Sequence, residues 1–340
     1  MTGVLVDKPG GGALEAATTE VPRATRIEDI YIVAVDTDAV IGRLLVKDKL
    51  VELKERLYLY RRVDEETFRR GSAAAIRQQV DPRKVEPLVL WLRRGTRVKV
   101  HLKNLIEHNP KKLPKGVPVS IHPHGVDYNI NSDGTYMGRN PYKAIVYPGQ
   151  TSTYEWEAML PGTWPMHDHG FPEYHVPHRG LFGAIVVKTD EEHKTLDKDF
   201  VVFFHTFTET ESGQIMSAIN YHAELMMPRV MLAGGDPADA MKVGGGLPEL
   251  LTPTWEAKVG ERVKFRVLNF SNQFHNFHIH GHRWKDPDGR WIDVITVGPA
   301  EFYELTLEAG VPNGPGDWMY HCHVFSHVDE GMWGIFRVTS

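Results

Sequence analysis

Cys322 is the only cysteine of the chain, and a histidine stands on each side of it. His327 and Met332 follow it at successive intervals of five residues. A thiolate, imidazoles and a weak, long thioether bond form the ligand set of a blue copper site that transfers electrons. The types and the spacing of these residues therefore predict an electron-transfer copper site near the C-terminus.

Histidines recur as four His-x-His pairs, one of which encloses the cysteine. Because successive side chains of a strand point to opposite faces, both imidazoles of a pair lie on one face and the enclosed sulfur lies on the other. Eight imidazoles are more than one metal ion can bind, so a second metal centre is predicted opposite the sulfur. The pairs are His122 and His124, His167 and His169, His278 and His280, and His321 and His323.

Strand parity also assigns His275, which lies an odd number of positions before His278 and His280. A regular strand turns it away from those two imidazoles, so we group it with Cys322, His327 and Met332. Taken singly, a His-x-His pair is more often a surface feature, a lone cysteine a small buried residue and a methionine core filler. Four pairs, one of them around the only cysteine, favour the metal interpretation.

An internal repeat organises the chain, because three motifs of the first half return in the second half in the same order. Two copies of one structural unit are therefore predicted in tandem. Short alternating runs between Gly and Pro turns predict β-strands over residues 97–102, 153–156, 183–187, 262–267 and 302–307. The repeated segments are 95–104 and 260–269, 122–125 and 278–281, and 162–164 and 316–318.

The first copy of the repeat lacks the residues of the predicted blue copper site. Asp168 stands at the position of Cys322, Val119 at that of His275 and Leu181 at that of Met332. Only the second copy is therefore expected to hold this copper, while both copies contribute imidazoles to the second centre.

The chain resembles the multicopper oxidases over roughly residues 85–340, and most closely their small two-domain bacterial laccases. The resemblance implies an all-β fold of two tandem cupredoxin-like Greek-key β-sandwich domains. The expected division is an N-terminal arm over 1–28, a first domain over 29–190 and a second over 191–340. The motifs that carry the resemblance are His122-Pro-His-Gly-Val-Asp-Tyr128, Ser132-Asp-Gly134, Gly162-Thr-Trp-Pro-Met-His-Asp-His169, His275-Asn-Phe-His-Ile-His-Gly-His-Arg-Trp284 and Gly316-Asp-Trp-Met-Tyr-His-Cys-His323.

The resemblance also implies a role for each ligand and four copper ions per subunit. It assigns Asp133 as a proton relay and Tyr128 as a redox-active neighbour of the copper cluster, although Asp133 and Gly134 also form an ordinary turn pair and Tyr128 could be an ordinary strand aromatic. The type 1 copper would take His275, Cys322, His327 and Met332, the type 2 copper His122 and His278, and the type 3 pair His124, His167, His169, His280, His321 and His323.

The activity implied by the resemblance is one-electron oxidation of phenols and aromatic amines, coupled to the four-electron reduction of O2 to water. Electrons would enter at the edge of His275 or His327 and reach the trinuclear cluster through Cys322. A metal oxidase acting on Fe(II) or Cu(I) is an alternative within the family. A copper nitrite reductase and a non-enzymatic copper carrier are the alternatives outside it, and neither explains four histidine pairs.

Composition bounds the other possibilities. The chain has 340 residues, enough for two domains, and a net charge of −5 without a basic face, which argues against a nucleic-acid partner. No apolar run approaches the length of a membrane span. Residues 1–25 hold no apolar segment behind a basic start, so no signal peptide is visible. The compartment is secreted or periplasmic if a leader was removed, and cytoplasmic otherwise.

Because each of the two domains would hold half of the eight imidazoles, we expect a homotrimer in which the first domain of one subunit meets the second domain of the next.

Residues 47–84 depart from the family pattern and predict an extended hairpin followed by a short helix, most simply a structural decoration. The loop 215–246 contains several methionines, which could recruit Cu(I) but more often pack between domains. His282 is expected to support the metal-binding histidines without binding metal itself.

Overall fold

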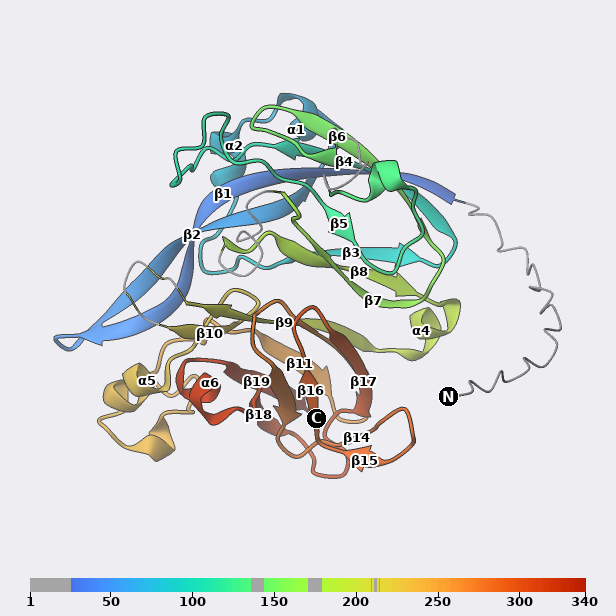
Figure 1. Ribbon diagram of the computed structural model, residues 1–340. Coiled ribbons are helices and arrows are strands. Elements are labelled where there is room, and N and C mark those ends of the chain that lie inside the picture. The colour runs from blue at the N-terminus through green and yellow to red at the C-terminus, as the bar shows by residue number, and fades with distance from the viewer. Residues whose placement is uncertain (1–25, 136–143, 171–178, 209, 211–212, 214) are drawn as a thin grey trace, which may run out of the picture.

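The computed structural model describes residues 26–135, 144–170, 179–208, 210, 213 and 215–340 (Figure 1). Most of the predicted N-terminal arm lies outside these residues. The described chain folds into two β-sandwiches, one above the other in Figure 1. This confirms the predicted all-β fold of two tandem cupredoxin-like domains. Among the residues described, no helix has the length and apolar character needed to span a membrane.

The first sandwich packs the sheet β2-β1-β4-β6 against the sheet β3-β8-β7-β5. Strand β4 illustrates why these residues form a sandwich strand, because Val98, Val100 and Leu102 are buried and alternate with residues that are half-buried. The strands are β1 (Arg26–Val46), β2 (Lys49–Val63), β3 (Leu88–Arg93), β4 (Thr96–Asn104), β5 (His122–Pro123), β6 (Thr151–Ala158), β7 (Gly162–His167) and β8 (Phe182–Lys188).

The second sandwich packs the sheet β10-β9-β12-β17 against the sheet β11-β19-β18-β13-β16, with β14 and β15 as a separate hairpin. All five runs predicted as strands in the two copies are strands. The strands of this sandwich are β9 (Lys198–Phe207), β10 (Met216–Ile219), β11 (Thr254–Lys258), β12 (Arg262–Asn269), β13 (His275–Ile279), β14 (Trp284–Lys285), β15 (Trp291–Ile292), β16 (Val294–Val297), β17 (Phe302–Glu308), β18 (Gly316–Cys322) and β19 (Trp333–Thr339).

The two sandwiches meet through β8 and β9, which are buried on both faces. Phe182, Ala184 and Val186 of β8 join Val201 and Phe203 of β9 in an apolar cluster between the sandwiches. The residues between them in each strand point into the core of their own sandwich. A strand with two buried faces has an unbroken apolar sequence, as both of these strands do. The apolar joint makes the two sandwiches one compact body.

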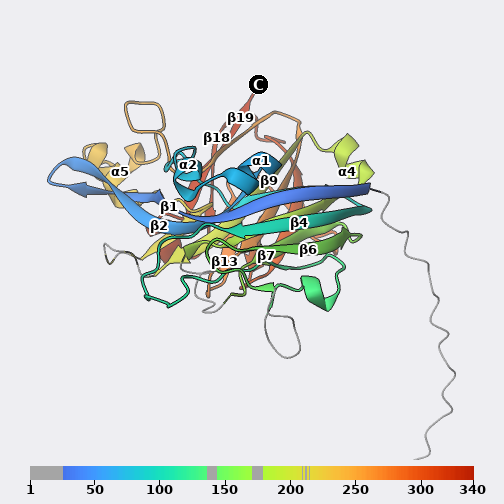
Figure 2. The ribbon, with the colours of Figure 1, turned by 90° about the horizontal axis from the view of Figure 1, so that it is seen from above.

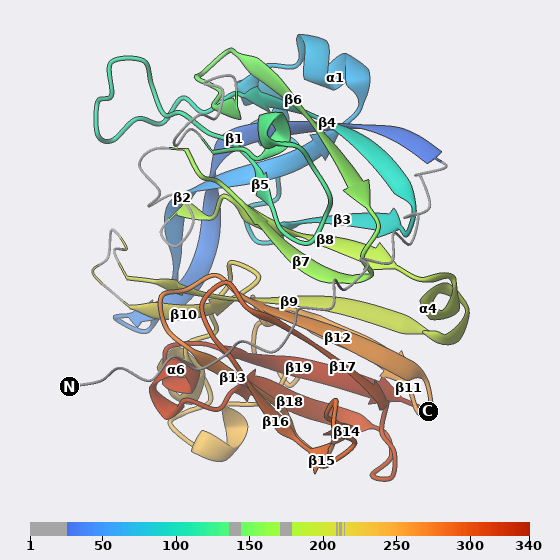
Figure 3. The same cartoon turned by 45° about the vertical axis from the view of Figure 1, so that its right-hand side comes forward.

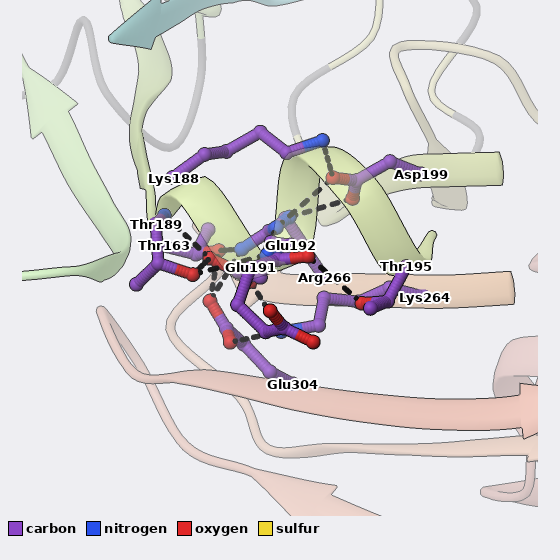
Figure 4. Close-up of polar contacts among 10 residues, drawn as sticks. All are labelled: Thr163, Lys188, Thr189, Glu191, Glu192, Thr195, Asp199, Lys264, Arg266 and Glu304. Atoms are coloured by element: carbon purple, nitrogen blue, oxygen red, sulfur yellow. Dashed lines mark hydrogen bonds and ion pairs between the residues drawn. The ribbon is translucent and has the colours of Figure 1, made fainter. Parts of the chain in front are cut away.

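A buried ion-pair network lies at one end of this joint, around Arg266 of β12 (Figure 4). The Arg266 side chain is 0% exposed, and its guanidinium stacks near Trp91. The network balances three cations, Lys188, Lys264 and Arg266, against three carboxylates. It spans β7, β8 and the helix α4 (Asp190–Thr195) between the sandwiches, as well as β9, β12 and β17. The groups that accept from the Arg266 guanidinium are Asp199, Glu192, Glu304 and the Thr163 hydroxyl, at 2.6–3.1 Å.

Strands β1 and β2 form a long hairpin that reaches past the first sandwich to the second (Figure 2). Its turn at Lys47 and Asp48 has positive φ at both residues, as a tight hairpin turn requires. The Ile41 carbonyl of β1 accepts from the Ala223 backbone at 2.8 Å, so the hairpin is tied to the second sandwich. The hairpin predicted within 47–84 is present but begins much earlier, at residue 26. Two short helices follow it, α1 (Glu65–Arg70) and α2 (Ala73–Arg77).

The methionine-containing loop 215–246 is divided in its packing. Met216 is buried beside Gly42 of the hairpin, which fits the expected packing role. Met227 and Met231, on helix α5 (Met226–Leu232), are 68% and 51% exposed and so do not pack between the sandwiches. Helix α5 contacts both the hairpin and helix α6 (Phe325–Asp329).

Candidate metal centres

The predicted blue copper ligands converge from two neighbouring strands and a helix of the second sandwich. His275 begins β13, Cys322 ends the adjacent β18, and His327 lies on α6. The Cys322 sulfur is 3.6 Å from Nδ1 of His275 and 3.5 Å from Nδ1 of His327, and the two Nδ1 atoms are 3.1 Å apart. Met332, the fourth residue, is fully buried in the same core cluster as Cys322.

The outer nitrogens of these two imidazoles have hydrogen-bond acceptors. Nε2 of His275 lies 2.7 Å from the Ser271 hydroxyl, and Nε2 of His327 lies 2.8 Å from Oε1 of Gln273. If both Nε2 atoms carry the ring proton, both Nδ1 atoms present bare lone pairs toward the sulfur. Partners on the outer nitrogen orient an imidazole for metal binding.

The first histidine set lies on β5, β7 and the turns that follow them. His122 and His167 are cross-strand partners, and Nε2 of His124 is 3.1 Å from Nε2 of His167. His169 completes the set, with its ring centroid 5.0 Å from that of His122 and 4.9 Å from that of His167. Nδ1–H of His122 donates to the Asp133 carbonyl at 2.7 Å, and Nδ1–H of His167 to the Asp168 carbonyl at 3.1 Å.

The second histidine set repeats this arrangement on β13 and β18. His278 and His321 are cross-strand partners, and Nε2 of His280 is 3.2 Å from Nε2 of His321. His323 adds a fourth ring, with centroids 5.4 Å from His278 and 5.3 Å from His321. Nδ1–H of His278 donates to the Asp293 carbonyl at 2.7 Å, and Nδ1–H of His321 to the Cys322 carbonyl at 2.8 Å.

These three clusters fit metal ions. Donor atoms held about 2.0–2.3 Å from a common ion lie about 3–3.6 Å apart, which is the spacing of the bare nitrogen and sulfur atoms here. Burial, with some contribution from neighbouring imidazoles, lowers the pKa of His167 and His275 to about 3 and that of His124 and His321 to about 4. The imidazoles are therefore neutral at physiological pH, as metal binding requires.

The internal repeat is reproduced in the backbone at the position of the predicted blue copper ligands. The Cys322 N–H donates to the Met332 carbonyl at 3.0 Å, and the Asp168 N–H donates to the Leu181 carbonyl at the same distance. Oδ1 of Asp168 accepts from the backbone of Ser120 at 2.7 Å and of Gly170 at 2.9 Å. In the first sandwich, a carboxylate that binds backbone amides thus occupies the place of the thiol.

The two predicted relay residues lie beside His122. Oδ1 of Asp133 is 3.6 Å from Nδ1 of His122, and the Asp133 carboxylate also accepts from Thr135. The Tyr128 ring centroid is 6.4 Å from that of His122. Partial burial and the Asp133 carboxylate, which accepts a hydrogen bond from Tyr128, raise the pKa of that phenol. Both residues are therefore near the first histidine set.

His282 supports the second set through the backbone. Its Nδ1–H donates to the His280 carbonyl at 2.8 Å, and its Nε2 accepts from the Gly310 N–H at 2.9 Å. Both ring nitrogens are thus committed and His282 is nearly fully buried, so it cannot itself bind a metal ion in this conformation. His282 was predicted to support the metal-binding histidines, and it contacts the backbone carbonyl of His280 rather than the imidazole of that residue.

The two histidine sets do not meet within the chain. Among the described residues the close ligand atoms form three separate groups, one at each set and one at Cys322. The first set belongs to the upper sandwich and the second to the lower one, as Figure 3 shows for β5 and β7 against β13 and β18. Each set is thus an incomplete half of a larger centre if eight imidazoles act together.

Sequence reasoning missed the partners of the outer imidazole nitrogens. Four of them are backbone carbonyls, which every residue type has, so no sequence signal could identify them. Ser271 and Gln273 are side-chain partners close in sequence to His275, and a search for acceptors near each ligand could have proposed them.

Family models described as multicopper oxidase match residues 86–192 and 225–340. The chain therefore belongs to the multicopper oxidase family, and it contains two β-sandwiches. The match over 86–192 covers the first histidine set, and the match over 225–340 covers the second set and the Cys322 group.

Curated relatives include a probable nitrite reductase-hydroxylamine oxidoreductase fusion protein of Kuenenia stuttgartiensis, 35% identical over 74% of this chain and 27% of that protein. Ferroxidase HEPHL1 of Homo sapiens is 27% identical over 72% of this chain and 22% of its own length. Ceruloplasmin of Rattus norvegicus is 26% identical over 84% of this chain and 27% of its own length. The chain spans only about a quarter of the length of these relatives.

Solved structures share the fold. A blue copper oxidase from Nitrosomonas europaea matches with a TM-score of 0.62 and 20% identity, over 92% of this chain and 86% of that one. A copper nitrite reductase from the same organism matches with a TM-score of 0.60 and 17% identity, over 92% of this chain and 94% of that one. At these identities the likeness concerns the fold alone.

Proposed function

We propose that this chain is a laccase-type oxidase that couples one-electron oxidation of phenols and aromatic amines to the four-electron reduction of O2 to water. The proposal rests on one observation above all. Each sandwich brings four imidazole rings together, and the second set is covalently continuous with the cysteine of a third ligand group. The proposed electron-transfer site and the proposed multi-metal centre would thus be linked within one strand.

Four copper ions per chain are proposed, with the ligands already assigned from sequence. His275, Cys322, His327 and Met332 would hold the type 1 copper. His122 and His278 would hold the type 2 copper. Bound copper would supply one-electron transfer at the first site and O2 reduction at the second. The type 3 pair would be held by His124, His167, His169, His280, His321 and His323.

The residues of this chain supply connection, orientation and protons. The Cys322 carbonyl accepts from Nδ1–H of His321, so backbone and hydrogen bond join the thiol to the second set. Buried side chains exclude water from the thiol, whose pKa is raised by burial in the metal-free protein. Asp133 is proposed to pass protons toward His122, with Tyr128 as its hydrogen-bonded neighbour.

The proposed assembly is a homotrimer with the cluster between subunits. The two half-sites lie on different sandwiches and form separate groups, so a complete eight-imidazole centre needs a second copy of the chain. A head-to-tail contact of the first sandwich with the second sandwich of the next chain closes into a ring when the rotation permits. Three half-site pairs would then form three clusters.

Oxidation of Fe(II) is the principal alternative, because several relatives are named as ferroxidases. The three groups of close ligand atoms in the described residues are the proposed copper sites, so steady-state rates with Fe(II) and with a phenol are needed to distinguish the two kinds of reductant.

Nitrite reduction is the second alternative, favoured by the names of one relative and one structural neighbour. An enzyme of that kind uses a lone second copper with three histidines, which leaves most of the two four-histidine sets unused. Measuring bound copper per chain, with steady-state rates for a phenol, an aromatic amine, Fe(II), Cu(I) and nitrite, tests these alternatives together. Four copper ions with phenol oxidation are expected, and nitrite turnover without O2 consumption would overturn the proposal.

The assembly is tested by complementation. His167→Ala inactivates the first half-site and His280→Ala inactivates the second, so each variant alone is expected to be inactive. Mixing the two under subunit exchange should restore some activity, because a fraction of interfaces receives two intact halves. A fully active monomer in sedimentation, or proven exchange without recovery, would locate the cluster within one chain.

A further inference from the structure

The proposed type 1 ligands are sealed from solvent. Cys322, Met332 and His275 are 0% exposed, and His327 is 6% exposed. A reducing substrate therefore cannot touch the sulfur atoms or the inner nitrogens. Electrons must enter through whatever group lies against the outer edge of one of the two imidazoles.

The outer edge of His275 leads further into the protein. Its Nε2 lies against the Ser271 hydroxyl, and Ser271 is only 4% exposed. That hydroxyl is also within hydrogen-bond distance of Oδ1 of Asn269, which is fully buried, and of the Gln273 carbonyl. Among the described residues, the side chains that the outer edge of His275 contacts, directly or through Ser271, are therefore buried.

The outer edge of His327 leads to the surface through one side chain. Its Nε2 is 2.8 Å from Oε1 of Gln273, and Gln273 is exposed. Because Nδ1 of His327 faces the sulfur, Nε2 carries the proton and the facing atom of Gln273 is its oxygen. The carboxamide nitrogen then points its two hydrogens elsewhere, and it donates to no residue that the structure describes.

We propose that Gln273 is the residue through which the reducing substrate meets the protein, its carboxamide oxygen bound to His327 and its carboxamide hydrogens donated to a substrate oxygen. This inference rests on the proposed function, and it names the substrate class for that function. The free N–H groups fit a reductant with an acceptor oxygen, such as a phenol or a phenolate. They repel a bare metal cation, since the amide presents its positive end outward.

The reaction at this position balances without a further cofactor. With copper bound at the Cys322 group, a phenol that accepts a hydrogen bond from Gln273 would give one electron to that site and its hydroxyl proton to water. The product is a phenoxyl radical. The electron passes through the Gln273 carboxamide and its hydrogen bond to His327, and the exposed position of Gln273 gives the proton access to bulk solvent.

The test compares substitutions of Gln273 with matched substitutions of Asn272, its exposed neighbour. Gln273→Leu removes both the acceptor for His327 and the donor for the substrate. Gln273→Glu keeps an acceptor, removes the donor and adds a negative charge. Asn272→Leu removes a carboxamide as Gln273→Leu does, and Asn272→Asp adds a negative charge as Gln273→Glu does. Both changes lie one residue before Gln273. Both positions are exposed, so none of the four substitutions is expected to disturb folding.

Each variant is assayed by redox titration of the blue band and by steady-state kinetics with guaiacol and with hexacyanoferrate(II). Both Gln273 variants should raise KM for guaiacol by about five- to tenfold, the worth of one hydrogen bond, with a smaller change in kcat. Gln273→Leu should raise the reduction potential, because an imidazole without an acceptor is a weaker donor, and Gln273→Glu should lower it.

The Asn272 variants distinguish a direct contact between the substrate and residue 273 from the longer-range effect of an added surface charge. Gln273→Glu and Asn272→Asp should both slow hexacyanoferrate(II) about fivefold, as one added charge near a surface would. Neither Asn272 variant should change the potential or KM for guaiacol. If the Asn272 variants match the Gln273 variants, or if the Gln273 variants leave both quantities unchanged in a blue protein, this inference is wrong while the proposed function stands. A copper-loaded wild type without a blue band overturns the proposed function and this inference with it.

Discussion

Replacing Arg266 with methionine tests how strongly the ion-pair network holds the two sandwiches together. The substitution keeps most of the length of the side chain and removes only its charge and its donors. Arg266 is fully buried and donates five hydrogen bonds at 2.6–3.1 Å, four of them to carboxylates. Two lysines then remain to neutralise three carboxylates, so the network keeps one negative charge in excess, although each carboxylate still contacts a lysine.

The expected loss is about 3–5 kcal/mol, the range found when one member of a buried ion pair is removed. The network also lowers the pKa of Glu192 to about 2, because Lys264 and neighbouring donors outweigh the opposing effect of burial. Arg337 is the matched control. It makes a similar two-pronged contact with Asp317, at 2.8 and 3.0 Å, but its side chain is 33% exposed. Arg337→Met should therefore cost only about 0.2–1 kcal/mol.

Urea unfolding of the metal-free protein, followed by circular dichroism and tryptophan fluorescence, measures both losses without the linkage that bound copper adds. Adding Asp199→Asn to Arg266→Met restores the charge balance and should recover part of the loss. An Arg266→Met protein as stable as Arg337→Met, or a double variant less stable than Arg266→Met alone, would refute the account of an uncompensated buried charge.

Three further predictions concern the metal sites. Cys322→Ser should abolish the visible charge-transfer band and the oxidase activity while cluster copper stays bound, and a variant that remains blue would remove Cys322 from the ligand set. Met332→Leu should raise the reduction potential and speed the oxidation of high-potential phenols, because a weak axial donor is lost; an unchanged potential would make Met332 a packing residue. The metal-free protein should lose stability as pH falls from about 6.5 towards 4, because burial holds the pKa of His167 and His275 at about 3 and the unfolded chain takes up protons first. Urea midpoints across this pH range should fall less in His275→Asn, and an identical profile in the two proteins would contradict the assignment.

The ligand groups could be predicted from sequence because the alternation of side chains along a strand is a local property. His275 and His278 are an odd number of residues apart, so alternation alone predicted them on opposite faces of a strand. In the structure His275 lies beside the Cys322 sulfur and His278 lies beside His321. Alternation likewise identified strands such as β4 and β12. The internal repeat matched Asp168 with Cys322, and the backbone hydrogen bonds of the two residues agree.

Other features depend on contacts between distant segments, and local patterns contain no information about them. Arg266 lies in a run correctly predicted as a strand, but its partners are 38 to 103 residues away, so the ion-pair network was missed. The predicted start of the hairpin, at residue 47, was wrong. The turn at Lys47 and Asp48 has positive φ at both residues but contains no Gly or Asn, the residues that usually indicate such a turn in a sequence. The exposure of Met227 and Met231 follows from how α5 packs, which composition alone does not determine.

The outer partners of the imidazoles differ between the centres in their chemical origin. At the two histidine sets they are backbone carbonyls, of Asp133, Asp168, Asp293 and Cys322, and a substitution changes a side chain but leaves its carbonyl in place. At the Cys322 group they are the side chains of Ser271 and Gln273, which a single codon change can replace. Sequence drift can therefore retune the entry of electrons and the choice of reductant, while the orientation of the multi-histidine sets is protected from point mutation at those contacts.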